Sequence, residues 1–446
     1  MSQYQYPKGN VLYRNLQHAL PLIKYGRGAY LYDLKGKKYL DGSGGAAVVN
    51  IGHGVREVVE AMSGQAGKVA YLSGLQFTHF PVEKLAEQVA EFLPFPEGKV
   101  CFLTSGSEAV EAALKLARQY WVEMGKTGKD RFISRKPSYH GNTLAALGLS
   151  ARKHYQEAFR PMLLKSSKIH APYCYRCPWE KSYPTCQMKC AYELEEEIQR
   201  LGKDKVAAFI TEVIGGSSTG ASVPPAEYLQ IVRKICNKND VLLIADEIMT
   251  GVGRTGKWLA CDHFDLVPDI IVMGKGLTSG YVPLSAVATK KSLTDVLFKR
   301  GKSFLHHQTY AHHPVACAAA VATLNRLRKN SLVQYCARIG DVLQKKLNSL
   351  RSHPRVGDVR GRGLLIGIEF VKDQKKKKPF PRAQKYVERF VASALEKGLI
   401  LWPNIGHADG TNGDLVLVAP PFIITDREVS LIEEKLAAVL TEIEEA

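Results

Sequence analysis

From about residue 99 onward, short apolar runs alternate with stretches in which apolar residues recur at helical spacing. The runs are rich in Val and Ile and are too short to be helices. They cover residues 100–104, 206–214, 241–245, 270–273 and 284–288. Strands that are apolar on both faces and separated by helices are typical of a mainly parallel sheet with helices on both sides. The pattern therefore predicts an α/β domain.

The two ends of the chain follow another pattern. Residues 26–40 (GRGAYLYDLKGKKYL) predict a β-hairpin outside the sheet. The last third predicts a helix, a strand pair around residues 359–370 and two further helices. We therefore expect a large domain over residues 61–333 and a smaller α+β domain built from residues 1–60 and 334–446.

Composition narrows the class of protein. The chain is 45% hydrophobic and 23% charged, as in ordinary globular proteins. It contains no apolar run of about 18 residues, the length that a membrane span needs. Residues 1–15 lack the pattern of a secretory signal, so we expect a cytoplasmic location.

The net charge of +18 permits a polyanionic partner such as nucleic acid. The basic residues are scattered, however, and their one dense run, Lys375 to Lys378, lies between an aspartate and a Pro-Phe-Pro segment. Such a run predicts an exposed loop. No helix-turn-helix or comparable module is present in the sequence, so we expect neither a nucleic-acid nor a membrane partner.

The nine cysteines do not predict disulfides, because the chain lacks a secretory signal. Four of them, Cys174, Cys177, Cys186 and Cys190, follow the spacing C-x2-C-x8-C-x3-C. Thiolates at such intervals could close a structural zinc or iron–sulfur site. We favour the alternative, a set of reduced cysteines in a surface insertion, and no metal ligand is assigned.

Polar residues follow several of the predicted strands, at the edge where ligands bind in open α/β sheets. After the first strand, Ser105, Gly106 and Ser107 open a helix. The free N–H groups and the dipole of a helix N-terminus favour a phosphate there. A serine followed by Glu108 is also ordinary helix capping, so this segment alone decides little.

Two later strands end in residues suited to catalysis. Asp246 ends one strand and needs a cationic or hydrogen-bonding partner, such as a protonated pyridine nitrogen, unless it caps the next loop. Ile248 could pack under a flat ring. Lys275 lies between two glycines, where a lysine amine can form a Schiff base or remain a solvated turn residue. Farther on, Thr309 offers a hydroxyl for a phosphate oxygen within a histidine-rich segment that shows no ligand spacing for a metal.

In this order, the segments resemble the class III aminotransferases, which depend on pyridoxal 5′-phosphate (PLP) and have fold type I. The resemblance runs from Gly26 to the APPFIIT segment at residues 419–425. It is most specific over residues 245–276, where ADEI, GVGRTG and GKG follow one another. It implies PLP as the cofactor, a ping-pong transamination between a small amino donor and an oxo acid, and a homodimer with shared active sites; a tetramer stays open.

The resemblance also implies roles for single residues. Lys275 would hold PLP covalently and Asp246 would pair with the pyridine nitrogen. Ile248 and Tyr139 would cover the two ring faces, and Thr309 would reach the phosphate in the neighbouring subunit's site. The full expected set, with Lys275 and Asp246 as the catalytic pair, is Ser105, Gly106, Ser107, Tyr139, His140, Glu212, Asp246, Ile248, Lys275 and Thr309.

One departure bears on the substrate. Relatives that act on ornithine-like substrates have an arginine just before the APP segment, whereas residues 403–418 contain none here. A bidentate carboxylate clamp is hard to replace with lysine, and Glu212, which would face that arginine, has no evident partner. The chain is thus similar to ω- and β-amino acid:pyruvate aminotransferases, and we expect an ω-amino acid, β-amino acid or amine as donor and pyruvate as acceptor.

Alternatives remain open at this point. They are an acetylornithine- or 4-aminobutyrate-type aminotransferase that uses 2-oxoglutarate, another class III enzyme such as an aminomutase or decarboxylase, and, more remotely, a basic polyanion-binding protein.

Overall fold

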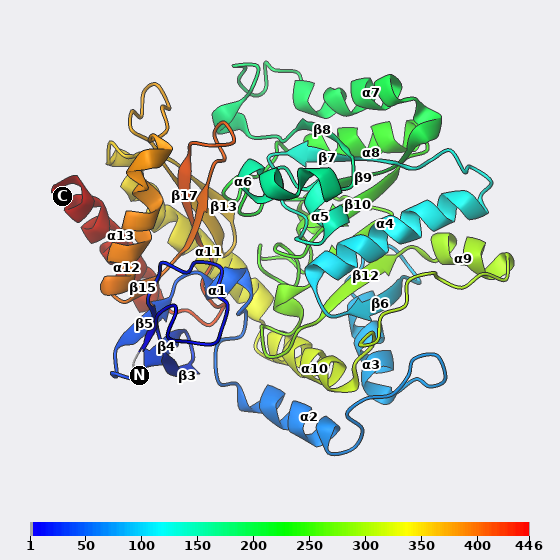
Figure 1. Cartoon of the computed structure of the whole chain (residues 1–446), viewed down its shortest axis with the longest axis horizontal. Helices are drawn as coiled ribbons and strands as arrows, with labels where there is room; N and C mark the ends of the chain where they lie inside the picture. Colours follow the sequence, from blue (N-terminus) through cyan, green and yellow to red (C-terminus); the bar gives the residue numbers. More distant parts are fainter. Residues whose placement is uncertain (1–2, 446) are drawn as a thin grey trace.

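The largest element of the fold is a seven-stranded sheet, seen in a computed structural model that describes residues 3–445 (Figure 1). Residues 1, 2 and 446, which the expected smaller domain includes, lie outside the described residues. The strand order is β6-β12-β11-β10-β9-β7-β8. The strands are β6 (Lys99–Leu103), β7 (Arg131–Lys136), β8 (Ser167–His170), β9 (Val206–Glu212), β10 (Leu242–Asp246), β11 (Ile270–Met273) and β12 (Ser285–Thr289).

Only β12 breaks the parallel arrangement of this described sheet, since it runs antiparallel to both β6 and β11. The other neighbouring pairs are parallel. The mainly parallel sheet predicted from the apolar runs is therefore confirmed. Two strands, β7 and β8, were not predicted, because charged residues interrupt their short apolar stretches (RFISRK and SKIH).

Helices cover both faces of the sheet, as the two-sided apolar strands predict. In β10, Leu242 and Ile244 belong to one buried cluster, whereas Leu243 and Ala245 belong to another. The first cluster includes α4 (Gly106–Glu123), α5 (Leu144–Leu149) and α9 (Lys291–Lys299). The second includes α3 (Phe80–Ala90), α7 (Lys189–Leu201), α8 (Tyr228–Lys238) and α10 (Pro314–Lys329).

A smaller α+β region is built from both chain ends, at the left of Figure 1. One sheet has the order β13-β14-β17-β16 and the other the order β15-β5-β4-β3. Their strands are β3 (Ile23–Arg27), β4 (Tyr30–Asp33), β5 (Lys38–Asp41), β13 (Val356–Arg362), β14 (Leu365–Phe370), β15 (Leu399–Ile400), β16 (Trp402–Ile405) and β17 (Asp414–Val418). The helices are α11 (Leu332–Asn348), α12 (Tyr386–Glu396) and α13 (Asp426–Glu445).

The parallel pair of β5 and β15 joins the two chain ends in one sheet. The predicted hairpin is thus part of a larger sheet: β3, β4 and β5 form an antiparallel meander, and β15 extends it. The domain limits stay a prediction, and the limit expected after residue 60 falls inside α2 (Arg56–Ala66). The chain also contains short elements, among them β1 (Gln3–Tyr4), β2 (Leu20–Pro21), α1 (Gly44–Ala47) and α6 (Lys153–Gln156).

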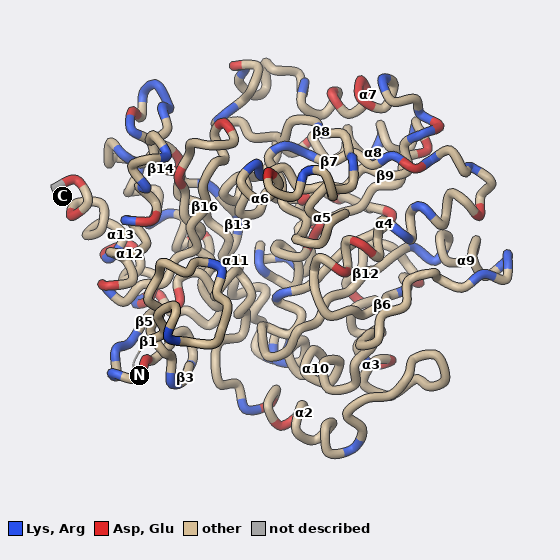
Figure 2. The backbone as a smooth tube through the Cα atoms, in the orientation of Figure 1, with Lys and Arg blue, Asp and Glu red and all other residues tan. Residues whose placement is uncertain are grey.

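Basic residues are spread over the whole chain (Figure 2). The run from Lys375 to Lys378 is exposed, in a turn closed by a bridge between Asp373 and Lys378, as predicted. Among the described helices, none has both the length and the apolar character that crossing a bilayer requires.

The four clustered cysteines surround one small cavity of about 20 Å³ beside α7. All are free thiols. Burial, with the neighbouring thiols, raises the pKa of Cys190 to about 12. Within residues 3–445, no set of three or more His, Cys, Asp or Glu side chains is arranged to hold a metal ion.

Candidate active site

A cavity of about 200 Å³ lies at the carboxyl ends of β9, β10 and β11. Its position agrees with the rule that open α/β sheets bind ligands at this edge. Eight of the ten expected site residues line it: Gly106, Ser107, Tyr139, His140, Glu212, Asp246, Ile248 and Lys275. The other two, Ser105 and Thr309, are exposed and do not line this cavity.

Lys275 follows β11 in a left-handed backbone conformation, directly before a tightly packed glycine. Its φ of 40° lies in the left-handed region, which costs energy for a residue other than glycine. A Cβ at Gly276 would lie 2.2 Å from the amide nitrogen of Asn50, so the second glycine of GKG is required by packing. Desolvation lowers the pKa of the Lys275 amine, although the carboxylates of Asp246 and Glu212 oppose this shift. A lowered pKa makes the amine a better nucleophile at neutral pH.

Asp246 has the hydrogen-bonding partner that its burial demands. Its Oδ2 lies 2.7 Å from Nδ1 of His140, and its Oδ1 accepts from the backbone N–H of Ile248 at 3.1 Å. Because a carboxylate can only accept, Nδ1 of His140 is the donor. Nε2 of His140 is buried and has no partner among the described residues. The expected cofactor-binding residue His140 thus also orients the predicted catalytic carboxylate.

The start of α4 is shaped by glycine packing and by capping. A Cβ at Gly106 would lie 3.0 Å from the side chain of Ile248, so both residues crowd the same wall of the cavity. Ser105 and Glu108 form a reciprocal capping box, and the capping interpretation of the Ser105 side chain is correct. The first N–H groups of the helix, at Gly106 and Ser107, have no intrahelical acceptor and remain available to an anion.

Glu212 ends β9 directly beside Asp246 in the sheet register. Its Oε1 accepts from the N–H of Gly216 at 3.0 Å, and its Oε2 lies 4.0 Å from the guanidinium of Arg135. Burial raises the pKa of Glu212. The absence of an evident partner, inferred from the sequence, is therefore corrected: Arg135 is a buried residue of β7, a strand that the apolar pattern did not predict.

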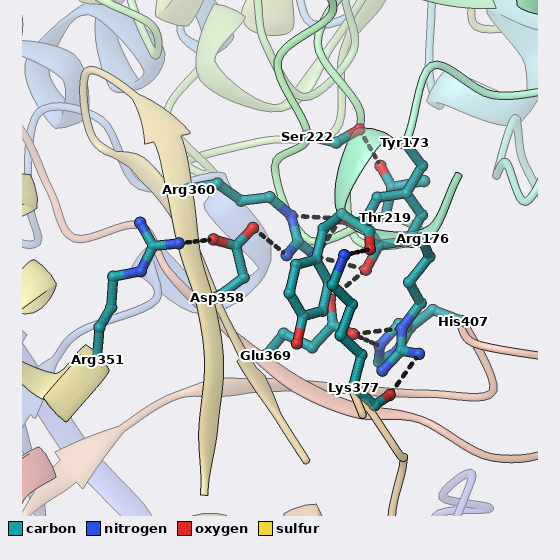
Figure 3. Close-up of polar contacts among 11 residues, drawn as sticks. Tyr173, Arg176, Thr219, Ser222, Arg351, Asp358, Arg360, Glu369, Lys377 and His407 are labelled. Carbon is teal, nitrogen blue, oxygen red and sulfur yellow. Dashed lines mark hydrogen bonds and ion pairs between the residues drawn. The ribbon is translucent and has the colours of Figure 1, made fainter. Parts of the chain in front are cut away.

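The loop that supplies Gly216 and Ser217 to the cavity is held by the C-terminal sheet (Figure 3). The guanidinium of Arg360 donates to the Thr219 carbonyl at 2.7 Å and to the Glu369 carboxylate at 2.8 Å. Tyr173 also donates to Glu369, which forms an ion pair with Arg176 and lies 3.2 Å from Nε2 of His407. The sequence reasoning missed several other residues that line the cavity, among them Ser217, Met249 and Thr250.

Comparisons with known proteins agree with this geometry. A family model described as "Aminotransferase class-III" matches residues 12–440. An uncharacterised aminotransferase of Bacillus subtilis, YodT, is 42% identical over 95% of this chain and 96% of its own length. An adenosylmethionine-8-amino-7-oxononanoate aminotransferase of Methanocaldococcus jannaschii is 34% identical, covering 94% of this chain and 92% of its own. A putrescine–pyruvate aminotransferase of Pseudomonas aeruginosa is also 34% identical, with 92% and 88% covered.

Among solved structures, an (S)-enantioselective ω-transaminase from Thermomicrobium roseum superposes with a TM-score of 0.91 at 34% identity. The match covers 97% of this chain and 96% of that one. Fold type I, predicted from the motifs, is thereby confirmed. The chain belongs to the class III aminotransferases, the PLP-dependent family whose motifs its sequence carries.

Proposed function

We propose that this enzyme transfers an amino group from an ω-amino acid, a β-amino acid or an amine to an oxo acid, with pyruvate as the preferred acceptor. The observation that carries the proposal is one cavity that contains both an amine with lowered pKa, Lys275, and a buried carboxylate, Asp246.

The cavity fits PLP in its chemistry. A helix N-terminus with free N–H groups suits the phosphate, and an acceptor-only carboxylate suits a protonated pyridine nitrogen. Ile248 and Tyr139 supply apolar walls for a flat ring. In this assignment Lys275 holds the cofactor covalently, and Gly106 and Ser107 bind its phosphate. Bound PLP supplies the electron sink that stabilises the charge left when a Cα–H bond breaks.

The residues of the chain then divide the work. Asp246, oriented by His140, keeps the ring nitrogen protonated, because an adjacent negative charge favours the charged form of a base. With PLP bound and the donor amine in its place, the amine of Lys275 would be free to act as the base at the donor's Cα and as the acid that returns the proton. The same residues serve both half-reactions, which accounts for the expected ping-pong kinetics.

Two observations favour the donor and acceptor classes. The segment before the APP motif lacks the arginine of ornithine-type relatives, and similar proteins are named as a putrescine–pyruvate aminotransferase and an ω-transaminase. We further propose a homodimer in which Thr309, exposed and outside its own cavity, contributes to the partner's site. A cytoplasmic location remains a prediction from the sequence.

The test combines a spectrum with a donor panel. The purified protein should absorb in the visible or near-ultraviolet, and the band should shift when an amino donor is added. Lys275→Ala should abolish that shift and turnover. Turnover with ω- or β-amino donors and pyruvate supports the proposal. Strong activity restricted to N-acetylornithine and 2-oxoglutarate, or turnover that persists in Lys275→Ala, would reject it.

A further inference from the structure

Arg152 is a buried cation beside the candidate active site. It follows α5, and only 8% of its surface is exposed. Its Nη1 lies 3.4 Å from the hydroxyl of Ser217, and its guanidinium lies 5.9 Å from the centre of the Tyr139 ring. Both contacted residues line the cavity. Among the described residues, no carboxylate forms an ion pair with Arg152, and its buried Nε has no hydrogen-bond partner.

A second buried arginine shows what a purely structural role requires in this fold. Arg254, in the GVGRTG segment, also lacks an ion pair among the described residues, but its guanidinium is engaged in several hydrogen bonds. It donates to the carbonyls of Leu364, Ala419 and Pro420 and to the side chain of Asn50. Within residues 3–445, the Nε of Arg254 is unpaired too, so the contrast lies in the terminal nitrogens: those of Arg152 make one long hydrogen bond, to Ser217. Most of the five N–H donors of Arg152 are left for another molecule.

The surroundings of Arg152 add positive rather than negative charge. The Tyr155 ring lies 4.4 Å from the Arg152 guanidinium and 4.8 Å from that of Arg14. Burial lowers the pKa of Arg152, but an arginine stays protonated at neutral pH. A buried charge without a counter-charge is costly. An anionic group at this side of the cavity would offset that cost and accept from the fork of N–H groups.

We propose that Arg152 binds the carboxylate of the substrates and so determines donor specificity. The inference rests on the proposed transaminase function and deepens it. Arg152, next to Tyr139 and Ser217, would take the place of the carboxylate-binding arginine that is absent before the APP segment. An amino acid donor then pairs with Arg152, whereas an amine that has no carboxylate leaves the guanidinium unpaired. The enzyme should therefore prefer carboxylated donors over amines of equal length.

The test compares matched donors in the half-reaction, without an acceptor. β-Alanine and 4-aminobutyrate are set against propylamine and butylamine, and conversion of the cofactor is followed by absorbance. KM denotes the donor concentration that gives half the maximal rate of this conversion. Arg152→Gln should raise the KM of the amino acids by about 10- to 100-fold, the range expected for one charge-assisted contact. The KM of the two amines should change by less than about threefold. Arg152→Lys keeps the charge but loses the fork, so its KM values should lie between those of the wild type and Arg152→Gln.

A binding measurement provides a readout that does not depend on turnover. Valerate carries the carboxylate but has no amine to react, and its dissociation constant is measured by calorimetry on the holoenzyme. It should rise with Arg152→Gln by the same factor as the KM of the amino acids. Lys153→Gln is the matched control: it removes a positive charge at the next, exposed position and should change neither quantity.

Distinct outcomes separate the two proposals. If the wild type transaminates none of the donors, the proposed function fails, and valerate binding alone decides the role of Arg152. Equal losses with amino acids and amines, or unchanged valerate binding in Arg152→Gln, would overturn the assignment. If neither variant folds, the wild type decides, because a preference for carboxylated donors below tenfold contradicts a buried carboxylate clamp.

Discussion

Lys275 combines a left-handed backbone with an amine whose pKa is lowered by desolvation, and both features cost stability in the cofactor-free protein. Lys275→Met keeps the backbone cost but removes the desolvated amine, so it should stabilise the apoprotein by about 1 kcal/mol. The lowered pKa also predicts how the stability of the apoprotein changes with pH. Between the lowered folded pKa and the unfolded value of about 10.4, the unfolded chain binds more protons, so wild-type stability rises with pH. This rise should disappear in Lys275→Met, as measured by urea unfolding of the apoprotein at several pH values; a less stable variant would contradict this account.

In the proposed reaction, Asp246 acts through its charge rather than its shape. Asp246→Asn keeps the size of the side chain, and its oxygen can still accept from Nδ1 of His140 at the observed position. It removes the negative charge beside the proposed ring nitrogen. We expect kcat to fall by about 100-fold or more, as when other preorganised electrostatic groups are removed, with little change in thermal stability. Steady-state kinetics and a melting curve test this together, and an unaltered kcat would show that the charge is dispensable.

At the residue scale, local motifs predicted well which residues face the cavity, because each follows a strand end within a recognisable segment. Contacts between distant segments were not predictable in this way. The pair of His140 and Asp246 joins residues 106 positions apart, and Arg135 reaches Glu212 from a strand whose charged residues conceal it. Arg152 lies in a segment without a motif, so only its burial and missing partners draw attention to it.

At the scale of elements, side chains of β13 and β14 hold the loop around Thr219 that shapes the cavity (Figure 3). Burial opposes ionisation of Glu369, yet His407, Arg360 and Arg176 hold the pKa of its carboxyl well below the usual range. The loop also packs closely against β14. A Cβ at Gly367 would lie 2.2 Å from the Gly220 carbonyl, so only glycine permits this approach. The loop therefore depends on close approach of the two segments as well as on the ion pairs.

Glu369→Gln should destabilise the fold by about 3 kcal/mol, because it leaves buried arginines without their shared counter-charge. A carboxyl with lowered folded pKa contributes stability above its unfolded value of about 4.3, and that contribution is lost as pH falls. Wild-type stability should thus drop steeply below about pH 4, and the drop should be smaller in the variant. Glu433→Gln, which removes a partly exposed ion pair with Lys346, is the control and should cost under about 1 kcal/mol. Equal losses in the two variants would refute the argument.

The elements that the sequence predicted are those with a strong periodic signal. Apolar runs located β9, β10 and β11. Glu212 and Asp246 end the first two strands, and Lys275 follows the third. The antiparallel direction of β12 was not predictable, because an apolar run has the same composition whichever way it points. Direction follows from the connection: the chain from β11 returns after a short segment, without a crossover helix, and β12 pairs with β11 as its antiparallel neighbour.

At the scale of the whole molecule, the segment from Tyr71 to Phe80 leaves large apolar side chains in solvent. Leu75 is 76% exposed, Phe77 67% and Phe80 81%. The ring of Tyr71 contacts that of Tyr310, next to Thr309, with centroids 6.1 Å apart. Adjacent exposed apolar residues of this kind mark interaction surfaces. The proposed dimer interface is therefore this surface, which would bring Thr309 close to the partner's cavity.

Charges placed on this surface should separate the subunits. In light scattering, the double variant Leu75→Asp, Phe77→Asp should have the mass of a single chain, whereas the wild type should have twice that mass. Phe298→Asp, on α9, is the control, since Phe298 is equally exposed, at 81%, but belongs to another element.

Sharing of the site has its own test. A mixed dimer of Lys275→Ala and Thr309→Ala subunits has one intact site only if Thr309 acts across the interface, because Lys275 of one subunit then meets Thr309 of the other. Its cofactor affinity at that site should match the wild type, and should be about tenfold weaker if Thr309 serves its own subunit.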